Sequence, residues 1–366
     1  MLKIDLIAGA RPNFMKIAPI IDAILEEQAK GTDIQFRLIH TGQHYDKNMS
    51  DSFFVQLGIP QPNVNLGAGG GTQAEQTAAI MVGYEKLLLS ERTNLCLVVG
   101  DVTSTMACAI VAQKLHIPVA HVEAGIRSGD WTMPEEINRL VTDSITNYFF
   151  TTTPDATKTI LSTGVSEDRV FWVGNTMIDT LLKQRPGFRK PNFWDGLDLK
   201  KGQYIVMTLH RPANVDDEEK LKELLDEIIS NSNGLPLIFP VHPRTAKILA
   251  TLNIGHQQLH TIEPLGYLEF NYIVENALAV ITDSGGITEE TTVMGVPCMT
   301  LRDNTERPET VDVGTNELIG TNPKAIKPAL EKLFAGEWKK GSIPELWDGN
   351  TAKRIVSILK YLQVAS

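Results

Sequence analysis

The sequence has few cysteines and no excess of positive charge. Of its 366 residues only Cys96, Cys108 and Cys298 are cysteines, and none belongs to a CxxC pair. A disulfide framework or a zinc site is therefore not expected. Lys and Arg together number 34 against 44 for Asp and Glu, a net charge of −10. This balance argues against binding to nucleic acid or to an anionic membrane surface.

Long apolar runs and several common motifs are also missing. No apolar stretch reaches the roughly 20 residues that span a bilayer, and the N-terminus alternates like a strand instead of resembling a secretory signal. We therefore expect a cytoplasmic protein. No GxxxxGK[ST] occurs, and no GxGxxG follows the first apolar run, so a P-loop and a standard dinucleotide site are disfavoured. No HxxxH pair lies on an expected helix, which is where zinc enzymes carry it, and we expect no metal.

What the sequence does contain is one repeated rhythm, a short apolar run followed by a polar turn and a helix-length amphipathic segment. The chain is longer than one core usually holds, so two domains are expected. Strands alternating with helices predict an α/β fold with parallel sheets covered on both faces. The expected strands are 3–7, 36–40, 95–99, 119–122, 148–151 and 170–173, then 204–209, 237–241, 259–262, 279–282 and 298–301.

Residues 183–202 interrupt the rhythm with several Pro and Gly residues, as a linker does. We expect an N-terminal domain over residues 1–173 and a C-terminal domain over 174–350. The final segment, 351–366, is expected to form an amphipathic helix to about residue 364 and to pack back on the first domain.

Polar side chains gather where the expected strands end, and ligands of open parallel sheets bind at those ends. Asp101, Glu123 and Glu135 are acids whose convergence would favour proton transfer near neutral pH. Helix capping explains Asp101 equally simply, and for Glu135 alone it is the better explanation. For Glu123 we favour a functional role. His210 ends a strand and is either an acid for a leaving group or a hydrogen-bonded histidine at a strand edge.

The run Ser284-Gly285-Gly286 follows an apolar strand and precedes a helix, where backbone N–H groups can hold a phosphate. A carboxylate such as Glu290, one or two turns later, can reach a ribose diol. A turn needed only for chain reversal is the alternative. Four basic residues are candidate partners of a diphosphate, although solvated surface charges are the simpler explanation of each: Arg11, Lys16, Arg302 and Arg307.

Several ordered segments together resemble the non-hydrolysing UDP-N-acetylglucosamine 2-epimerase family. The matching stretches are GARPNFMK, TGQHYD, VVGDVTST, HVEAGIRS, MPEEINR, GNTMID, TLHRPANVD, DSGGITEE and RDNTERPE, in order from Gly9 to Glu309. The resemblance implies two Rossmann-like domains in a GT-B-like arrangement, with the active site in the interdomain cleft.

The resemblance also implies roles for individual residues. Asp101, Glu123 and Glu135 match essential acids, His210 matches a catalytic histidine, and Lys16 matches a residue of the catalytic set. The implied substrate-binding residues also include Arg11, Arg139, Leu265, Phe270, Ser284, Gly285, Gly286, Glu290 and Arg307. Leu265 and Phe270 match the uracil site, Ser284 to Gly286 the diphosphate turn, and Glu290 the ribose contact.

The chemistry that the resemblance implies is elimination of UDP from UDP-GlcNAc to 2-acetamidoglucal, then re-addition to give UDP-ManNAc for surface polysaccharide synthesis. It needs no cofactor, and a homodimer is the family expectation. Asp46 and the Glu75-Gln76 pair replace residues that bind a second, activating nucleotide sugar, so this site is in doubt. The alternatives are a sister 2-epimerase acting on UDP-2,3-diacetamido-2,3-dideoxyglucuronate and a hydrolysing epimerase that releases ManNAc and UDP.

Overall fold

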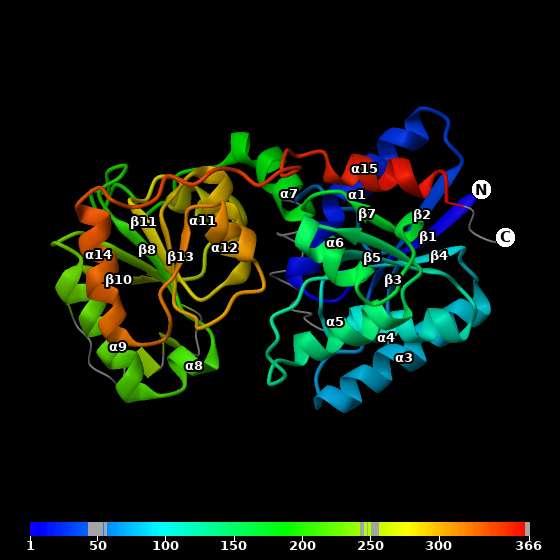
Figure 1. The fold of residues 1–366 in the computed structure, drawn as a ribbon, viewed down its shortest axis with the longest axis horizontal. Coiled ribbons are helices and arrows are strands. Elements are labelled where there is room, and N and C mark those ends of the chain that lie inside the picture. Colours follow the sequence, from blue (N-terminus) through cyan, green and yellow to red (C-terminus); the bar gives the residue numbers. More distant parts are fainter. Residues whose placement is uncertain (43–53, 55–56, 242–244, 247, 250–255, 363–366) are drawn as a thin grey trace. The chain divides into compact units, whose positions relative to one another are not determined.

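The computed structural model describes residues 1–42, 54, 57–241, 245–246, 248–249 and 256–362 (Figure 1). The chain forms two compact units, Met1–Lys183 with Glu345–Ser366, and Gln184–Pro344. No helix in these described ranges is long and apolar enough to cross a membrane.

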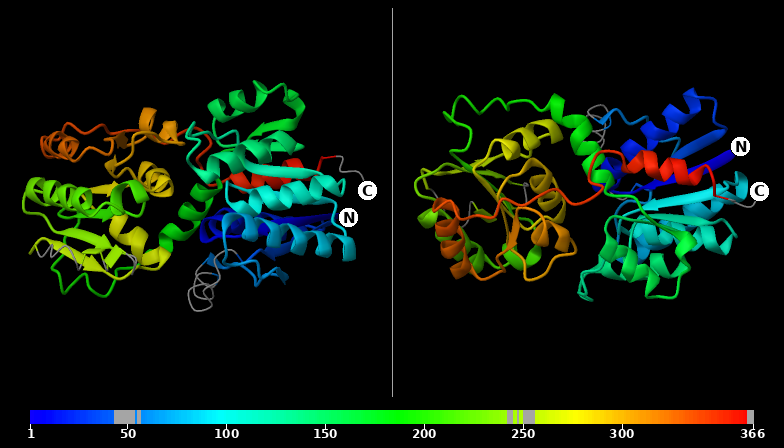
Figure 2. Two further views of the ribbon diagram at one scale, coloured as in Figure 1. Left: turned by 90° about the horizontal axis from the view of Figure 1, so that it is seen from below. Right: turned by 45° about the horizontal axis from the view of Figure 1, so that its top comes forward.

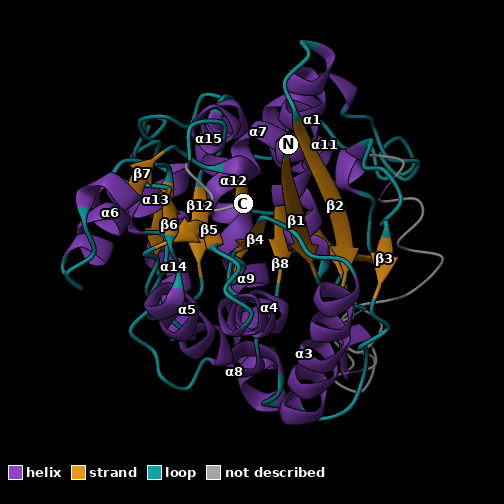
Figure 3. Cartoon of the chain, turned by 90° about the vertical axis from the view of Figure 1, so that its right-hand side faces the viewer, coloured by secondary structure: helices purple, strands orange, loops and turns teal. Residues whose placement is uncertain are grey.

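The first unit contains a parallel seven-stranded sheet in the order β3-β2-β1-β4-β5-β6-β7. Its strands are β1 Leu2–Ala8, β2 Ile34–His40, β3 Val64–Asn65, β4 Leu95–Val99, β5 Val119–Ala124, β6 Tyr148–Thr151 and β7 Val170–Trp172. Its helices are α1 Arg11–Ala29, α3 Gln73–Ser90, α4 Thr103–Lys114, α5 Pro134–Ile145, α6 Pro154–Leu161, α7 Thr176–Gln184 and α15 Thr351–Leu359, with the 3₁₀ turn η1 Glu167–Arg169. Helices α1 and α15 cover one face of the sheet, and α3, α4 and α5 cover the other (Figure 3).

The second unit contains a parallel six-stranded sheet in the order β10-β9-β8-β11-β12-β13. Its strands are β8 Ile205–Thr208, β9 Leu237–Pro240, β10 Leu259–Ile262, β11 Ala279–Thr282, β12 Cys298–Thr300 and β13 Asn316–Leu318. Its helices are α8 Pro212–Val215, α9 Glu218–Asn231, α11 Tyr267–Glu275, α12 Gly285–Met294, α13 Pro308–Asp312 and α14 Ile326–Phe334, with the 3₁₀ turns η2 Arg185–Gly187 and η3 Pro323–Ala325.

Alternation along β8 explains how both faces of the second sheet are covered. Ile205 and Met207 belong to one buried cluster with α9 and α14, whereas Val206 belongs to another with α11 and, at its edge, α12. Successive side chains of a strand point to opposite faces, so an apolar run buries both. The apolar strand patterns of the sequence follow from this double burial.

When the strands of each sheet are numbered from one, the second sheet has the order 3-2-1-4-5-6 of a doubly wound Rossmann sheet, and the first has the same order with a seventh strand, β7, added after the sixth. The prediction of two Rossmann-like domains with parallel sheets is confirmed. The direction of winding reverses between β1 and β4 in the first unit, and between β8 and β11 in the second. These are the positions where such sheets bind ligands.

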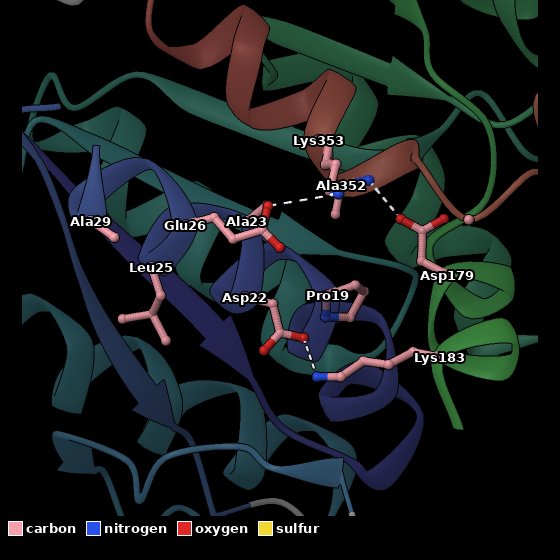
Figure 4. A pocket seen from close by; sticks show the side chains of 11 residues that line it. Pro19, Asp22, Ala23, Leu25, Glu26, Ala29, Asp179, Lys183, Ala352 and Lys353 are labelled. Carbon is pink, nitrogen blue, oxygen red and sulfur yellow. Dashed lines mark hydrogen bonds and ion pairs between the residues drawn. The ribbon is translucent and has the colours of Figure 1, made fainter. Parts of the chain in front are cut away.

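Helix α7 belongs to the first unit, so the division falls at Lys183, after the expected position at 173. The Asp179 carboxylate accepts hydrogen bonds from the backbone N–H groups of Thr351 (3.1 Å) and Ala352 (2.7 Å), at the start of α15. Thr180 donates to the carbonyl of Met15 in α1. Helix α15 lies along α1 (Figure 2), and a pocket lined by α1, α7 and α15 contains none of the predicted site residues (Figure 4).

Candidate active site

The loop after β1 is tied to the end of β4. The Asn13 side chain donates to the carbonyl of Val99 (2.8 Å) and accepts from the backbone N–H of Ala10 (3.1 Å). A Cβ atom at Gly9 would lie 2.0 Å from Ser104 Oγ, so only glycine fits there. This close packing places the first turn of α1 beside the ends of β4 and β5.

Lys16 and Glu123 form a buried ion pair at this point. Lys16 Nζ lies 2.7 Å from Glu123 Oε2, and the side chains are 11% and 2% exposed. Gly100, with φ +68°, lies beside them, because a Cβ at this residue would be 3.1 Å from Lys16 Nζ. The structure therefore brings together predicted residues from α1 and β5, next to Asp101.

Glu123 has a left-handed backbone, with φ +69°. The pairing of β5 with β6 shifts register between Val122 and Ala124, so Glu123 forms a bulge. A non-glycine residue in this region costs roughly 1–3 kcal/mol, and such strain is concentrated at functional sites. The conformation thus supports the functional interpretation of Glu123 over a purely structural one.

Asp101 is held by Arg139. Arg139 Nε and Nη2 donate to Asp101 Oδ2 (3.0 and 2.6 Å), and its Nη1 donates to Glu136 Oε2 (2.7 Å). The N-cap of α4 is Val102, so the capping explanation for Asp101 is wrong. The arrangement leaves Asp101 partly exposed at the strand end, with a fixed counterion.

The neighbours Glu135 and Glu136 differ in their surroundings. Glu136 is buried and accepts from the backbone N–H groups of Ser128 (2.9 Å) and Gly129 (3.1 Å). Burial acts to raise its pKa, but these hydrogen bonds and the one from Arg139 lower it below its usual value. Glu135 is half-buried and has no hydrogen-bond or ion-pair partner within the described residues. Glu135 is therefore available for chemistry, whereas Glu136 holds a loop.

In the second unit, His210 is oriented by Asp283. His210 Nδ1 lies 2.6 Å from Asp283 Oδ1, and the buried carboxylate also accepts from the backbone N–H groups of His210 (3.0 Å) and Arg211 (2.9 Å) and from the Asn214 amide (3.2 Å). Burial opposes ionisation of Asp283, but His210 and the backbone donors lower its pKa. With Nδ1 donating, the half-exposed ring presents Nε2. Asp283 was not among the predicted site residues.

The predicted diphosphate turn lies at the N-terminus of α12. Ser284 is the N-cap, and its side chain caps no N–H group within the described residues; N–H groups at a helix start are donors that can hold an anion. A Cβ at Gly285 would lie 2.7 Å from Glu306 Oε1 and 3.8 Å from Arg302 Nη1. Arg302 is buried, and its Nη1 has no hydrogen-bond partner within the described part. Gly286 is the second residue of α12.

Arg302 and Arg307 are each paired with a carboxylate. Arg302 Nη2 donates to Glu306 (2.6 Å), which lowers the pKa of this buried acid to about 2 although burial alone would raise it. Arg307 Nε lies 2.8 Å from Glu289 in α12, and both side chains are buried. The predicted cation Arg307 is therefore held against the same helix.

Glu290 is buried on the α11 side of α12. It accepts a hydrogen bond from Tyr267 (2.8 Å), and burial raises its pKa to about 7. Leu265 and Phe270 are half-buried against the apolar cluster that α11 shares with Ile287 of α12. The structure thus gathers an apolar surface, a carboxylate and an anion-binding turn around α11 and α12.

Two predictions concern residues that the structure leaves undescribed. The side chain of Arg11, the first residue of α1, and the whole of Asp46 lie outside the described residues. Within the described part, no group of three His, Cys, Asp or Glu side chains is placed to hold a metal ion.

Comparison with known proteins agrees with this arrangement. Residues 26–360 match the family model for UDP-N-acetylglucosamine 2-epimerase. A curated protein of that name from Methanocaldococcus jannaschii is 42% identical, over 98% of this chain and 99% of its own. The UDP-2,3-diacetamido-2,3-dideoxy-D-glucuronate 2-epimerase of Pseudomonas aeruginosa is 40% identical, over 87% and 88%.

A solved structure of the Methanocaldococcus jannaschii UDP-GlcNAc 2-epimerase, in complex with UDP-GlcNAc and UDP, superposes with a TM-score of 0.86. The two chains are 41% identical, and the match covers 99% of this chain and 100% of the other. Family model, curated relatives and solved structure agree over nearly the whole length. The chain belongs to the UDP-N-acetylglucosamine 2-epimerase family.

Proposed function

We propose that this chain is a non-hydrolysing UDP-GlcNAc 2-epimerase that interconverts UDP-GlcNAc and UDP-ManNAc. The observation that carries the proposal is the strained, buried Glu123 paired with Lys16 beside Asp101, because a carboxylate in such a position suits proton abstraction from carbon. Family membership supports the substrate class.

The reaction begins with removal of the C2 hydrogen as a proton, for which Glu123 is the base. The electrons of that C–H bond form the C1=C2 double bond, and the C1–O bond breaks with its electron pair leaving on UDP. The products of this half-reaction are 2-acetamidoglucal and UDP. Return of a proton to the opposite face of C2, followed by attack of UDP oxygen on C1, completes epimerisation. Glu135, which has no partner within the described residues, is suited to deliver that second proton.

Residues of the second unit bind UDP. The N–H groups at the start of α12 and the Arg302 guanidinium bind the diphosphate, Glu290 accepts from the ribose diol, and Leu265 and Phe270 pack against uracil. His210, held by Asp283, presents Nε2 to the departing diphosphate and stabilises its charge. Retaining UDP in this way permits re-addition instead of hydrolysis.

The test is turnover of UDP-GlcNAc in D₂O, followed by NMR. Because the proposal requires breaking C2–H, product and recovered substrate should carry deuterium at C2. Retention of the original C2 hydrogen in the product would exclude elimination. Release of free ManNAc as the main product would show the hydrolysing alternative.

Glu123→Gln tests the assigned base. We expect turnover and C2 exchange to fall by about 10²- to 10⁴-fold, the usual contribution of a general base, with UDP affinity unchanged. Asp179→Asn is the control, since Asp179 is another buried carboxylate of the same unit and lies in α7. It should retain wild-type turnover, and an equal loss in both variants would assign Glu123 a structural role.

A second candidate substrate, UDP-2,3-diacetamido-2,3-dideoxyglucuronate, is favoured by the similarity to the Pseudomonas aeruginosa relative. The same chemistry at C2 applies to both sugars, which differ at C3 and C6. Measuring kcat/KM for both under identical conditions distinguishes them. A higher value for the diacetamido sugar would replace the substrate in our proposal and leave the mechanism standing.

A further inference from the structure

His121 and Glu123 are two residues apart on β5 yet contact helices on opposite faces of the sheet. His121 contacts Asp143 of α5, whereas Glu123 contacts Lys16 of α1, and these helices cover different faces (Figure 3). In a regular strand, residues i and i+2 point to the same face. The bulge and the left-handed φ of Glu123 are what turn its carboxylate to the α1 side.

The Asp143 carboxylate holds both flanks of this bulge. Its Oδ1 lies 2.7 Å from His121 Nδ1, and its Oδ2 accepts from the backbone N–H of Gly125 (3.1 Å). These two partners lie two residues before and two residues after Glu123. Arg127 Nη1, 2.6 Å from Asp143 Oδ2, balances the charge. One buried carboxylate therefore fixes the strand on either side of the strained residue.

The His121 ring cannot turn to release this contact. Its Nε2 lies 2.8 Å from the carbonyl oxygen of Gly100, and the residue is fully buried. Each ring nitrogen therefore faces an oxygen atom, Asp143 Oδ1 on one side and the Gly100 carbonyl on the other, and the ring is held at both ends. Burial opposes ionisation of Asp143, but His121 and Arg127 lower its pKa, which keeps it an acceptor.

We propose that Asp143 is a positioning residue that holds Glu123 in its strained conformation for proton transfer at C2. It makes its contacts through His121 and Gly125, and in the structure it does not touch the Glu123 carboxylate. The inference rests on the proposed function, since it assumes that Glu123 is the base. Relaxation of the bulge would move the carboxylate away from the position beside Lys16 while leaving the UDP-binding residues of the second unit unchanged.

Asp143→Asn tests the role, because asparagine keeps the size and one acceptor but loses the charge. We expect kcat and C2 deuterium exchange to fall about 100-fold, the scale of a misplacement of about 1 Å at a reacting centre. KM and UDP affinity should stay at wild-type values. Asp179→Asn is the matched control, because that buried aspartate also accepts backbone N–H groups but contacts neither flank of Glu123. It should retain wild-type kcat.

A double-variant cycle with Glu123→Gln separates positioning from a general loss of structure. If Asp143 acts through Glu123, replacing Asp143 should lower kcat by a much smaller factor in the Glu123→Gln background than in the wild type. We expect the two factors to differ at least tenfold. Equal losses in both backgrounds, or an unchanged kcat in Asp143→Asn, would overturn the proposal. A loss of UDP binding together with kcat would also overturn it.

Should Asp143→Asn fail to fold, as judged by circular dichroism, His121→Gln replaces it in the same cycle. This variant keeps the charge of Asp143 and removes the ring between it and the strand, and the same criterion applies. Wild-type exchange is measured first. If the wild type shows no C2 exchange, the proposed function fails; if it does and the cycle is additive, only the role of Asp143 fails.

Discussion

Glu290 illustrates how burial at a single residue produces a testable pH dependence. Burial raises the pKa of its carboxyl group to about 7, so half the molecules carry it protonated at that pH. A protonated acid is a poor acceptor for a ribose diol. We expect the association constant for UDP-GlcNAc to rise as the pH increases through 7. Below pH 7 the constant should decrease with falling pH, and the decrease should approach tenfold for each pH unit. Isothermal titration calorimetry between pH 5.5 and 8.5 measures this.

Glu290→Gln is the control for that experiment, because its amide does not titrate in this range. The diphosphate diester of UDP-GlcNAc stays ionised throughout, so the ratio of wild-type to variant affinity isolates Glu290. The ratio should increase with pH and level off above 7. A constant ratio would remove Glu290 from the ribose contact.

Adjacent acids show the limit of sequence reasoning at this scale. Glu135 and Glu136 lie in the same first turn of α5, and a pattern of residue types does not distinguish them. The structure does, because Glu136 is buried against Ser128, Gly129 and Arg139 while Glu135 stays half-exposed. Asp283 directly follows β11, but its contact with His210 depends on the neighbouring strand β8, so the residue pattern alone does not single it out.

At the level of elements, most of the secondary structure follows from apolar runs. The strands at 95–99, 148–151, 259–262 and 279–282 agree with the expected bounds, because buried parallel strands are continuous apolar segments. β3 and β13 were not predicted, since these short edge strands have two and three residues and no apolar run. The bulge at Glu123 could not be predicted either, because nothing in the pattern of residue types indicates that a glutamate adopts a left-handed backbone conformation.

The attachment of α15 to α7 gives a prediction about stability. Burial raises the pKa of Asp179 to about 6 although the backbone N–H groups of α15 lower it. A raised folded-state pKa means that the folded protein binds the proton more tightly. Protonated Asp179 therefore stabilises the folded state. This contribution is complete below the unfolded pKa of 3.8 and is lost as the pH rises through about 6. The shift corresponds to about 3 kcal/mol.

Asp179→Asn should remove this term, because the amide resembles the protonated acid and cannot ionise. One of the two acceptor oxygens becomes a donor in the variant, which lowers its unfolding free energy equally at every pH. Relative to the wild type, we expect the unfolding free energy of the variant to rise by about 3 kcal/mol between pH 4 and pH 7. Urea denaturation at several pH values checks this. A difference independent of pH would show that Asp179 does not titrate in that window.

On the scale of the whole molecule, two sheets that share the strand order 3-2-1-4-5-6, the first with one further strand, carry different side chains at their strand ends. The first unit carries Lys16, Asp101 and Glu123, which suit proton transfer. The second carries the α12 turn, Arg302 and Glu290, which suit a nucleotide diphosphate. Neither set completes the proposed reaction alone, because elimination and re-addition require a base for the sugar and a grip on UDP. Under the proposed function, this division of roles is the reason for two domains.

The regulation of the whole enzyme follows from residues outside the catalytic set. The resemblance to the branch of the family that its own substrate activates predicts that Glu75-Gln76 replace an Arg-Gln pair that binds a second nucleotide sugar. The Glu75 carboxylate accepts from the backbone N–H of Thr72 (2.8 Å) and, with the Thr72 hydroxyl, caps α3. An acid in this role repels a diphosphate and is already used by the helix.

We therefore predict that turnover of UDP-ManNAc follows hyperbolic kinetics without added UDP-GlcNAc. Initial rates are measured at low conversion, with a coupled assay that removes UDP-GlcNAc as it forms, because product would otherwise act as an activator. A lag that added UDP-GlcNAc abolishes, or a strict requirement for it, would show that a second nucleotide-sugar site operates despite Glu75. Identical rates with and without trace UDP-GlcNAc would show an epimerase governed by substrate concentration alone.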